Sequence, residues 1–476
     1  MLTAAVTHHD AGRFAKALPH FRKYLKRRPD DVAALNMASF AAFQTDHADM
    51  ALEWLNTAKA ADPDDPQTFY NLGLVSQSVG LHEDAADAYS RAAELAPEFA
   101  SEHYKLGTAV TQLGRLADAI AAFDRAIEAD PGHGKAMSSK GYVLRTQGKP
   151  DDAAAVYGRA ASILMGDSEV LVGLGKSLQD AGRLAEAAST FARAVDAEPH
   201  DPEAISNLAN VLVQRGEAED AVAACDVFLA HHPANTSVLA AKSVALNECG
   251  EAEAVRQLVD LDRFVTPIRH ERAPGFKGIE AFNEAMVAHA ANHPTLAVAP
   301  TSHATRLGKH SADLTVKPKG PVAAFEKMIG RGVKEFIERL GSDSTPPFIA
   351  HRPRKWKLAV WAIVLEGEGY QVSHIHRSAW LSGVYYAQVP SVVNEEGEKG
   401  WIEFGEPGPE YHWSATPETR RIKPEPGLMV LFPSYTFHRT IPFESTETRV
   451  SIAFDVVPEQ CAPTTTSSSV PARPAA

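Results

Sequence analysis

The first half of the chain repeats one pattern of apolar and polar positions every 34 residues. In the third unit, Ala85, Ala88, Tyr89 and Ala92 follow the spacing i, i+3, i+4, i+7, which places them on one face of a helix. The pattern predicts a helix, a turn and a second helix in each unit. A ring recurs at the Tyr89 position, and we expect these rings to fill the space between paired helices rather than to contact a ligand: Phe123, Tyr157 and Phe191.

Two further residue types keep the same period and mark the helix ends. A glycine stands where the first helix of a unit ends and the chain reverses, which favours a residue that tolerates a positive φ. A proline follows the second helix, which it cannot continue. The glycines are Gly12, Gly80, Gly114, Gly148, Gly182, Gly216 and Gly250, with Asp46 at the missing position, and the prolines are Pro29, Pro63, Pro97, Pro131, Pro199 and Pro233, with Met165 at theirs.

These units resemble the tetratricopeptide repeat over about residues 1–263, as roughly seven units and a final one. The resemblance implies a solenoid with a groove that holds peptides or other proteins. We therefore expect a protein or peptide partner in the groove. Polar residues of the first helices are the candidates for contact with it: Asn71, Lys105, Lys140 and Asn207.

From about Phe264 the period is lost and the chain changes character. A helix is predicted over 279–286, an irregular stretch over 293–319, and an amphipathic helix over 321–340. Several short apolar segments with glycine and proline between them then predict a β-sandwich or barrel. The expected strands cover residues 357–364, 380–387, 400–404, 419–423, 427–432 and 448–457.

Length and pattern together predict four parts. They are a solenoid over 1–263, connecting helices and an irregular segment over 264–345, a β domain over 346–459, and a disordered tail over 460–476.

Composition restricts the partners. The net charge of −13 disfavours non-specific binding to nucleic acid or to an anionic membrane surface. Three scattered cysteines cannot form a disulfide scaffold, which suits a reducing compartment. We see neither a signal peptide nor an apolar run long enough to span a bilayer, so a cytoplasmic protein is expected.

The candidate chemistry lies in the last hundred residues. His374 and His376 are two positions apart, so on a strand both rings point to the same side. His438 follows 62 residues later, and Arg449 and Ser451 come after it. An iron site open to oxygen needs a few fixed ligands on one side and free positions on the other. A guanidinium suits the far carboxylate of an acidic co-substrate.

Residues 355–458, with these motifs, resemble the 2-oxoglutarate- and iron(II)-dependent oxygenases that often follow tetratricopeptide repeats. The resemblance implies a multidomain fold: an all-α solenoid followed by a double-stranded β-helix, or jelly roll, with flanking helices. It further implies that His374 and His438 bind Fe(II), that Arg449 and Ser451 hold 2-oxoglutarate, and that O2 is the oxidant. Tyr385 is assigned to the cofactor-binding set, in an apolar wall with Phe432 and Phe454.

One residue departs from the family pattern. Most members place Asp or Glu two residues after the early His, and this chain has His376 there. His376 is then either the third ligand of a three-His site, or the iron has two protein ligands completed by water, or His376 is the early ligand and His374 lies behind it. We name His374, His376 and His438 as the predicted metal residues.

These observations predict a dioxygenase, a hydroxylase in type, whose repeats recruit a protein or peptide. Two other functions stay open. One is an adaptor with a degenerate, non-catalytic barrel, since the ligand carboxylate is missing. The other is a three-His enzyme of the thiol-dioxygenase type, although such a site has no need of the Arg449–Ser451 pair.

Overall fold

The structure is a computed structural model that describes residues 1–300, 303–341 and 345–459. The predicted disordered tail, 460–476, lies outside the described residues. The chain divides into two compact units, Met1–Pro199 and the part from His200 onward. The domain boundaries expected from the sequence stay a prediction, because this division marks where contacts are dense and does not test them.

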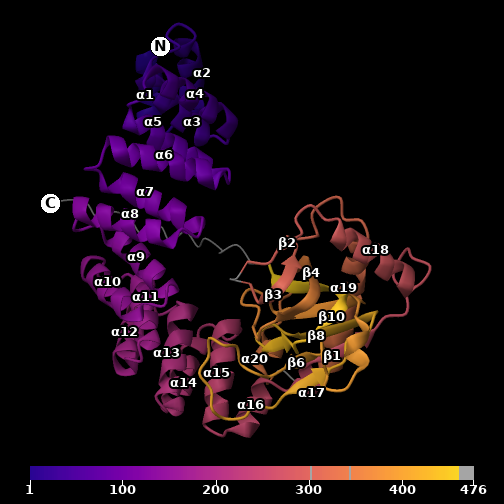
Figure 1. Cartoon of the computed structure of the whole chain (residues 1–476). Coiled ribbons are helices and arrows are strands. Elements are labelled where there is room, and N and C mark those ends of the chain that lie inside the picture. The colour runs from indigo at the N-terminus through magenta and orange to yellow at the C-terminus, as the bar shows by residue number, and fades with distance from the viewer. Residues whose placement is uncertain (301–302, 342–344, 460–476) are drawn as a thin grey trace, which may run out of the picture. The chain divides into compact units, whose positions relative to one another are not determined.

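The first unit consists of helices that follow one another in antiparallel pairs (Figure 1). These are α1 (Leu2–Asp10), α2 (Phe14–Leu25), α3 (Val32–Phe43), α4 (Ala48–Ala61), α5 (Pro66–Ser78), α6 (His82–Leu95), α7 (Ala100–Gln112), α8 (Leu116–Ala129), α9 (Gly134–Thr146), α10 (Pro150–Ile163), α11 (Ser168–Asp180) and α12 (Leu184–Ala197). The second unit opens with four more helices of the same pattern: α13 (Pro202–Gln214), α14 (Ala218–Leu229), α15 (Thr236–Glu248) and α16 (Ala252–Leu258).

The turn positions behave as the period predicts. All of the periodic glycines have positive φ, for example 81° at Gly80, and Asp46 takes φ 60° at the position without glycine. Asp tolerates this region better than most residues, which explains why it can stand there.

A second set of glycines makes room for the recurring rings. A Cβ on Gly107 would lie 2.6 Å from the ring of Phe123, and one on Gly175 would lie 2.5 Å from the ring of Phe191. The prediction that these rings are core is confirmed, because Phe123 and Phe191 are fully buried.

The rest of the second unit is a β domain with two antiparallel sheets. The larger sheet has the order β1-β8-β5-β10-β4-β3-β2, with β1 (Thr266–Arg269), β2 (Ala297–Val298), β3 (Thr305–His310), β4 (Trp356–Gln371), β5 (Leu381–Gln388), β8 (Leu428–Pro433) and β10 (Ser445–Pro458). The smaller sheet has the order β7-β6-β9, with β6 (Ile402–Phe404), β7 (Arg420–Ile422) and β9 (His438–Thr440).

Side chains from both sheets meet in one core. Val384 and Tyr386 of β5 and Phe432 of β8 pack with Ile402 and Phe404 of β6. Alternation along each strand sends the neighbouring residues to the opposite face. The predicted fold class is therefore confirmed, with an all-α solenoid followed by a jelly-roll domain.

Helices cover the outer face of the larger sheet (Figure 1). These are α18 (Ile279–Ala291) and α19 (Val322–Leu340), while α17 (Leu261–Phe264), α20 (Pro347–Ala350) and a 3₁₀ turn at Ser391–Asn394 are short. Phe325 of α19 lies 5.3 Å from the ring of Tyr385 and 5.7 Å from that of Phe454. The amphipathic helix expected over 321–340 is thus confirmed, and its apolar face supports the sheet.

The stretch expected to be irregular, 293–319, contains two strands. β3 pairs with β4, and β2 pairs with β3. The sequence of β3, Thr305–His310, is polar and has a bulge between Arg306 and Gly308, so it lacks the alternation that marks a half-buried strand. β1 is a further strand that the sequence does not predict, because Pro267 interrupts the pattern. Proline is tolerated there because β1 is an edge strand of the larger sheet.

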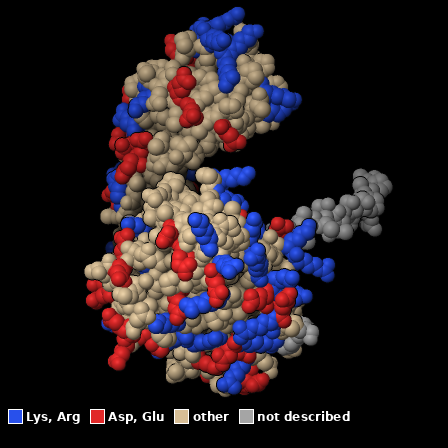
Figure 2. All heavy atoms as spheres, turned by 90° about the vertical axis from the view of Figure 1, so that its right-hand side faces the viewer, with Lys and Arg blue, Asp and Glu red and all other residues tan. Residues whose placement is uncertain are grey.

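Surface charge adds little to the stability of this unit. Acidic and basic side chains are intermixed on the face shown in Figure 2. Lys309 pairs with Glu366 at 3.1 Å, and Lys319 pairs with Glu326 at 2.6 Å. Such partly exposed pairs contribute about 0–1 kcal/mol each. Among the helices that the structure describes, none has the length and apolar character that a membrane span requires.

The turn glycines lead to a stability prediction. Replacing Gly80 by Ala puts a Cβ on a residue at φ 81° and should lower the free energy of unfolding by about 1–2 kcal/mol. Replacing Gly158 by Ala, inside α10 where a Cβ meets no atom within 4 Å, should raise it by about 0.5–1 kcal/mol. Urea denaturation of both variants measures the difference, and equal values would contradict the role of the turn.

Candidate metal centre

Three imidazoles meet between the two sheets. His374 and His376 follow β4, and His438 begins β9. His374 and His438 form an isolated antiparallel bridge, in which each backbone N–H donates to the other carbonyl at 3.1 Å. The ring centroids are 4.2 Å apart for His374–His438, 5.3 Å for His374–His376 and 5.1 Å for His376–His438. One ring nitrogen from each lies within 4.8 Å of the other two.

The same nitrogen of each ring is already engaged. Nδ1 of His374 lies 2.8 Å from the carbonyl of Val372, and Nδ1 of His438 lies 3.1 Å from that of Thr436. Nδ1 of His376 lies 2.6 Å from the Asp455 carboxylate. Since each of these partners is an acceptor, Nδ1 carries the proton in all three rings. Each Nε2 is left with a free lone pair, which is the arrangement that metal-binding histidines use.

The surroundings keep His374 and His438 neutral. Burial, together with the neighbouring His376, lowers the pKa of His374 to about 3. Burial also lowers the pKa of His438 well below its usual range, and both neighbouring rings act in the same direction. Neutral imidazoles are the form that binds a metal ion, so no proton has to be displaced from these two at neutral pH.

Asp455 of β10 is held in place from a second direction. The Ser382 hydroxyl donates to its Oδ1 at 2.6 Å, and the Ser382 and Ser434 hydroxyls are hydrogen-bonded at 2.8 Å. This network fixes the carboxylate that orients His376.

A cavity of about 370 Å³ opens beside the three rings. Phe432 forms part of its wall, with its ring centroid 4.5 Å from that of His438. Trp361 and His310 line another part, and Trp361 lies 5.6 Å from His376. Arg377, next to His376, also lines the cavity and is exposed.

Arg449 lies in the wall of the same cavity and is only 2% exposed. Its Nη1 donates to the carbonyl of Gly400 at 2.7 Å, and the guanidinium lies over the ring of Tyr386 at 5.0 Å. Its Nε has no hydrogen-bond partner, and neither has the Tyr386 hydroxyl, although both atoms are buried. Within the described part of the chain no carboxylate pairs with this arginine. A buried cation without a counter-ion is costly, so the site is complete only with an anion.

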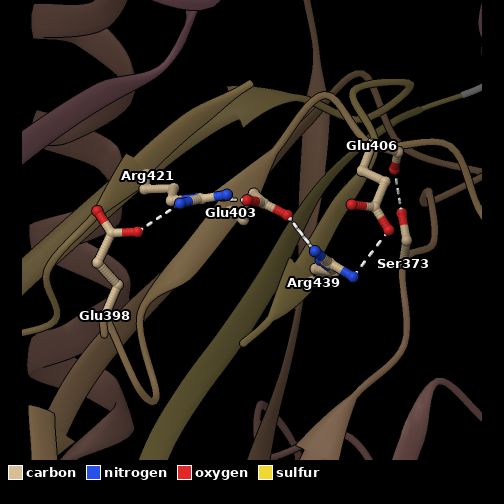
Figure 3. Close-up of polar contacts among 6 residues, drawn as sticks. All are labelled: Ser373, Glu398, Glu403, Glu406, Arg421 and Arg439. Carbon is tan, nitrogen blue, oxygen red and sulfur yellow. Dashed lines mark hydrogen bonds and ion pairs between the residues drawn. The ribbon is translucent and has the colours of Figure 1, made fainter. Parts of the chain in front are cut away.

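A line of ion pairs runs beside the metal candidates (Figure 3). Glu403 of β6, which is 1% exposed, lies between Arg421 and Arg439. Arg439 follows His438 and also pairs with Glu406 at 2.7 Å. The backbone carbonyl of Glu406 accepts a hydrogen bond from the hydroxyl of Ser373, the residue before His374. The segment that carries His374 and the strand that carries His438 are therefore both linked to this line of polar side chains.

Comparison with protein families agrees with this geometry. Residues 359–455 match the family described as "Putative 2OG-Fe(II) oxygenase". Residues 8–70, 70–134, 104–167 and 178–245 match tetratricopeptide repeat families. The chain joins tetratricopeptide repeats to a C-terminal 2OG-Fe(II) oxygenase domain. No curated protein matches it in sequence.

Several solved structures of repeat proteins resemble part of the chain. MamA is 26% identical, with 33% of this chain and 93% of MamA covered and a TM-score of 0.32. YrrB, described as a TPR protein with an unusual peptide-binding site, is 19% identical, with coverage of 39% and 95% and a TM-score of 0.36. A repeat protein from Cytophaga hutchinsonii is 14% identical, with coverage of 51% and 99% and a TM-score of 0.45.

In the oxygenase domain most of the residues singled out from the sequence lie together. His374, His376, His438 and Arg449 all line the cavity. Ser451 shares the inward face of β10 with Arg449 and is buried, but it is not among the residues that line the cavity.

Tyr385 requires a correction. It was expected at the cofactor, but its hydroxyl donates to Asn283 of α18 at 2.5 Å and its ring packs on Phe282 and Phe325, on the helix-covered face of the sheet. Alternation along β5 puts Tyr386 into the cavity instead. Phe454 is on the outer face for the same reason.

Sequence reasoning missed Tyr386 and Asp455. Side chains at even spacing along a strand share a face, so Asp455, six residues after Arg449, lies on the same face of β10. Tyr386 pairs with Ser451, which is two residues after Arg449, and so lies on that face of the sheet as well.

The buried imidazoles predict a pH dependence for the metal-free protein. A lowered pKa in the folded state means that the unfolded state binds these protons first. Stability is therefore full above about pH 6.5 and is lost as the pH falls toward 3. His438→Gln should make this decline shallower between pH 6.5 and 4.5, measured as the free energy of unfolding in urea with a chelator. The matched variant His351→Gln, at an exposed residue, should keep the wild-type slope. Identical slopes in all three proteins would show that His438 is not buried as a neutral base.

Proposed function

We propose that the C-terminal domain is a 2-oxoglutarate- and Fe(II)-dependent dioxygenase, a hydroxylase in type. The proposal is supported by three imidazoles that each place one ring nitrogen within 4.8 Å of the other two, beside a buried arginine that has no counter-ion among the described residues. Fe(II) held there would supply the activation of O2, with 2-oxoglutarate converted to succinate and CO2 and one oxygen atom placed on the substrate.

The residues fit this group by the chemistry of their donors. Neutral imidazole nitrogens suit Fe(II), and three of them on one side leave positions for a keto acid and oxygen. His374, His376 and His438 are the proposed ligands. The placement of His376 favours the three-His alternative, because Asp455 engages its Nδ1, which leaves Nε2 as the nitrogen available to a metal ion, and the ring lies with the other two in one cluster.

Asp455 gives a reason why a histidine can stand where the family has a carboxylate. It is hydrogen-bonded to His376, so a negative charge still reaches the site through the imidazole. It also orients the ring.

Arg449 is proposed to bind the far carboxylate of 2-oxoglutarate. Its unpartnered Nε and the nearby Tyr386 hydroxyl are two buried polar groups that need a partner. A carboxylate accepts hydrogen bonds from both. Phe432 excludes water from the space beside His438.

The repeats are proposed to recruit a protein or peptide to this enzyme. The proposal is supported by the family, since repeat solenoids present extended binding surfaces. Some of the polar residues expected to contact a partner already have partners within the chain. Asn71 bonds to Asn36, Lys140 pairs with Asp124, and Asn207 donates to Glu203.

Anaerobic addition of Fe(II) and 2-oxoglutarate to the full chain should give a visible metal-to-ligand charge-transfer band. His438→Ala should abolish it, because one of three ligands is lost, and His351→Ala should retain it. A wild-type protein without the band would refute the proposed function. If the cellular role survives in His438→Ala, the adaptor function is the correct one.

Arg449→Gln should weaken 2-oxoglutarate binding by about ten- to a hundredfold, since a charged hydrogen bond contributes about 1.5–3 kcal/mol. Titration of the charge-transfer band measures this, with Co(II) affinity as the check that the imidazoles are intact. Arg354→Gln, at an exposed arginine, is the matched control. Activity that ignores 2-oxoglutarate and is untouched by Arg449→Gln would favour the thiol-dioxygenase type.

A further inference from the structure

The last repeat helices hold a segment of the oxygenase domain as a groove would hold an extended peptide. Asn210 of α13 donates from Nδ2 to the carbonyl of Glu410 at 2.8 Å, and its Oδ1 accepts from the N–H of His412 at 2.7 Å. One amide side chain thus makes hydrogen bonds to the backbone carbonyl of Glu410 and to the backbone N–H of His412. We call residues 406–415 the bridging segment.

Helix α15 holds the far end of the bridging segment. The carboxylate of Glu248 accepts from the N–H of Ser414 at 2.6 Å, from its hydroxyl at 2.6 Å, and from the N–H of Ala415 at 2.8 Å. Asn247 donates to the carbonyl of Ala415 at 3.2 Å. Backbone groups that leave a sheet need partners, and here the repeat helices supply them.

The other side of the bridging segment touches the strands that carry the imidazoles. Ser373 donates to the carbonyl of Glu406, and Arg439 pairs with the Glu406 carboxylate (Figure 3). Tyr411 is buried, and its ring lies 5.1 Å from that of Phe437. Ser373 precedes His374, and Phe437 and Arg439 flank His438. The segment therefore lies between α13 and two of the three imidazoles.

The third imidazole has its own link to α15. The hydroxyl of Thr236 donates to the carbonyl of Arg377 at 2.6 Å, and Arg377 follows His376. His376 itself lies outside the regular ladders, where its N–H donates to the carbonyl of Ser434. One contact from the repeat helices thus ends one residue from His376 and three from His374, and Tyr435, three residues before His438, donates its hydroxyl to the carbonyl of Leu258 of α16 at 2.7 Å.

We propose that α13 and α15 are a positioning part of the metal centre, with Asn210 and Thr236 as positioning residues. By holding the bridging segment and the carbonyl of Arg377, they set the spacing at which the three Nε2 atoms converge. This inference rests on the proposed metal site. It adds that α13 and α15 help to position the metal ligands, whereas the proposed function gives the repeats only the role of recruiting a partner.

The physical reason lies in how the imidazoles are anchored. His374 and His438 are joined by one isolated bridge rather than by a continuous ladder. An isolated bridge has no neighbouring pairs to fix it, so small shifts of the flanking chain change the distance between the rings. A chelate of three rings tolerates such shifts poorly, which is why residues behind the ligands affect metal affinity.

The experiment is a Co(II) titration of the metal-free full chain, read by visible d–d absorption, together with the melting temperature. Asn210→Ala should weaken Co(II) binding by roughly tenfold and change the band shape. Asn207→Ala is the matched control, because it removes the same amide from the same helix, where Nδ2 donates only to Glu203 of α13. It should leave both affinity and spectrum unchanged.

Variants of Thr236 test the inference independently if Asn210→Ala does not fold. Thr236→Val keeps the shape but loses the hydroxyl, and should weaken Co(II) binding, while Thr236→Ser keeps the hydroxyl and should restore it. The inference is overturned if Asn210→Ala and Thr236→Val bind Co(II) as the wild type does, with the wild-type spectrum. If the His438→Ala variant binds Co(II) as tightly as the wild type does, the metal site itself is refuted. The failure of the inference and the failure of the metal site are therefore distinguishable.

Discussion

Removing three imidazoles and one guanidinium from water within a single cavity is the constraint on which the oxygenase domain depends. Burial favours the neutral form of His374 and His438. Hydrogen bonds at Nδ1 of all three rings fix where the remaining proton lies. Burial disfavours the charge on Arg449, which donates to the carbonyl of Gly400, lies over the face of Tyr386 and has no carboxylate partner among the described residues. Such a group destabilises the empty site and strengthens the binding of an anion.

Charge is arranged in layers around this cavity. Nearest the open space are neutral rings and one cation. Behind them lie Asp455, hydrogen-bonded to His376, and Glu403, held between two arginines. A carboxylate behind a ring adds negative charge to the site without using a coordination position. The three-His set therefore need not be a sign of a degenerate barrel.

Much of the fold could be predicted because it repeats. The period of 34 fixes the helix pairs, and even its exception is informative, since Asp46 takes the φ of the glycine that it replaces. The strands with clear apolar content were also predictable. β3 was not, because a polar, bulged strand is stabilised by its neighbours in the sheet rather than by its own pattern.

At the site, residue type and spacing were enough to single out His374, His376, His438 and Arg449, which line one cavity, while their roles stay a prediction. They were not enough for Tyr385, because a one-residue error in strand parity moves a side chain to the opposite face. Asp455 and its partner His376 are 79 residues apart in the chain, and Asn210 and its partner His412 are 202 residues apart. A local sequence pattern cannot predict contacts over such separations.

The contact at Asn210 also shows how a repeat can acquire a second role. The positions 34 and 68 residues earlier are Lys176 and Tyr142, so the amide is a feature of one unit and not of the repeat. Neighbouring Asn207 bonds within its own helix, although it is one turn away. The surface of α13 and α15 that reaches the bridging segment is filled by the chain itself. If the repeats recruit an extended partner, as proposed, its contacts have to lie on other helices, such as α1 to α12 of the first unit. Recruitment and positioning would then be assigned to different repeats of one solenoid.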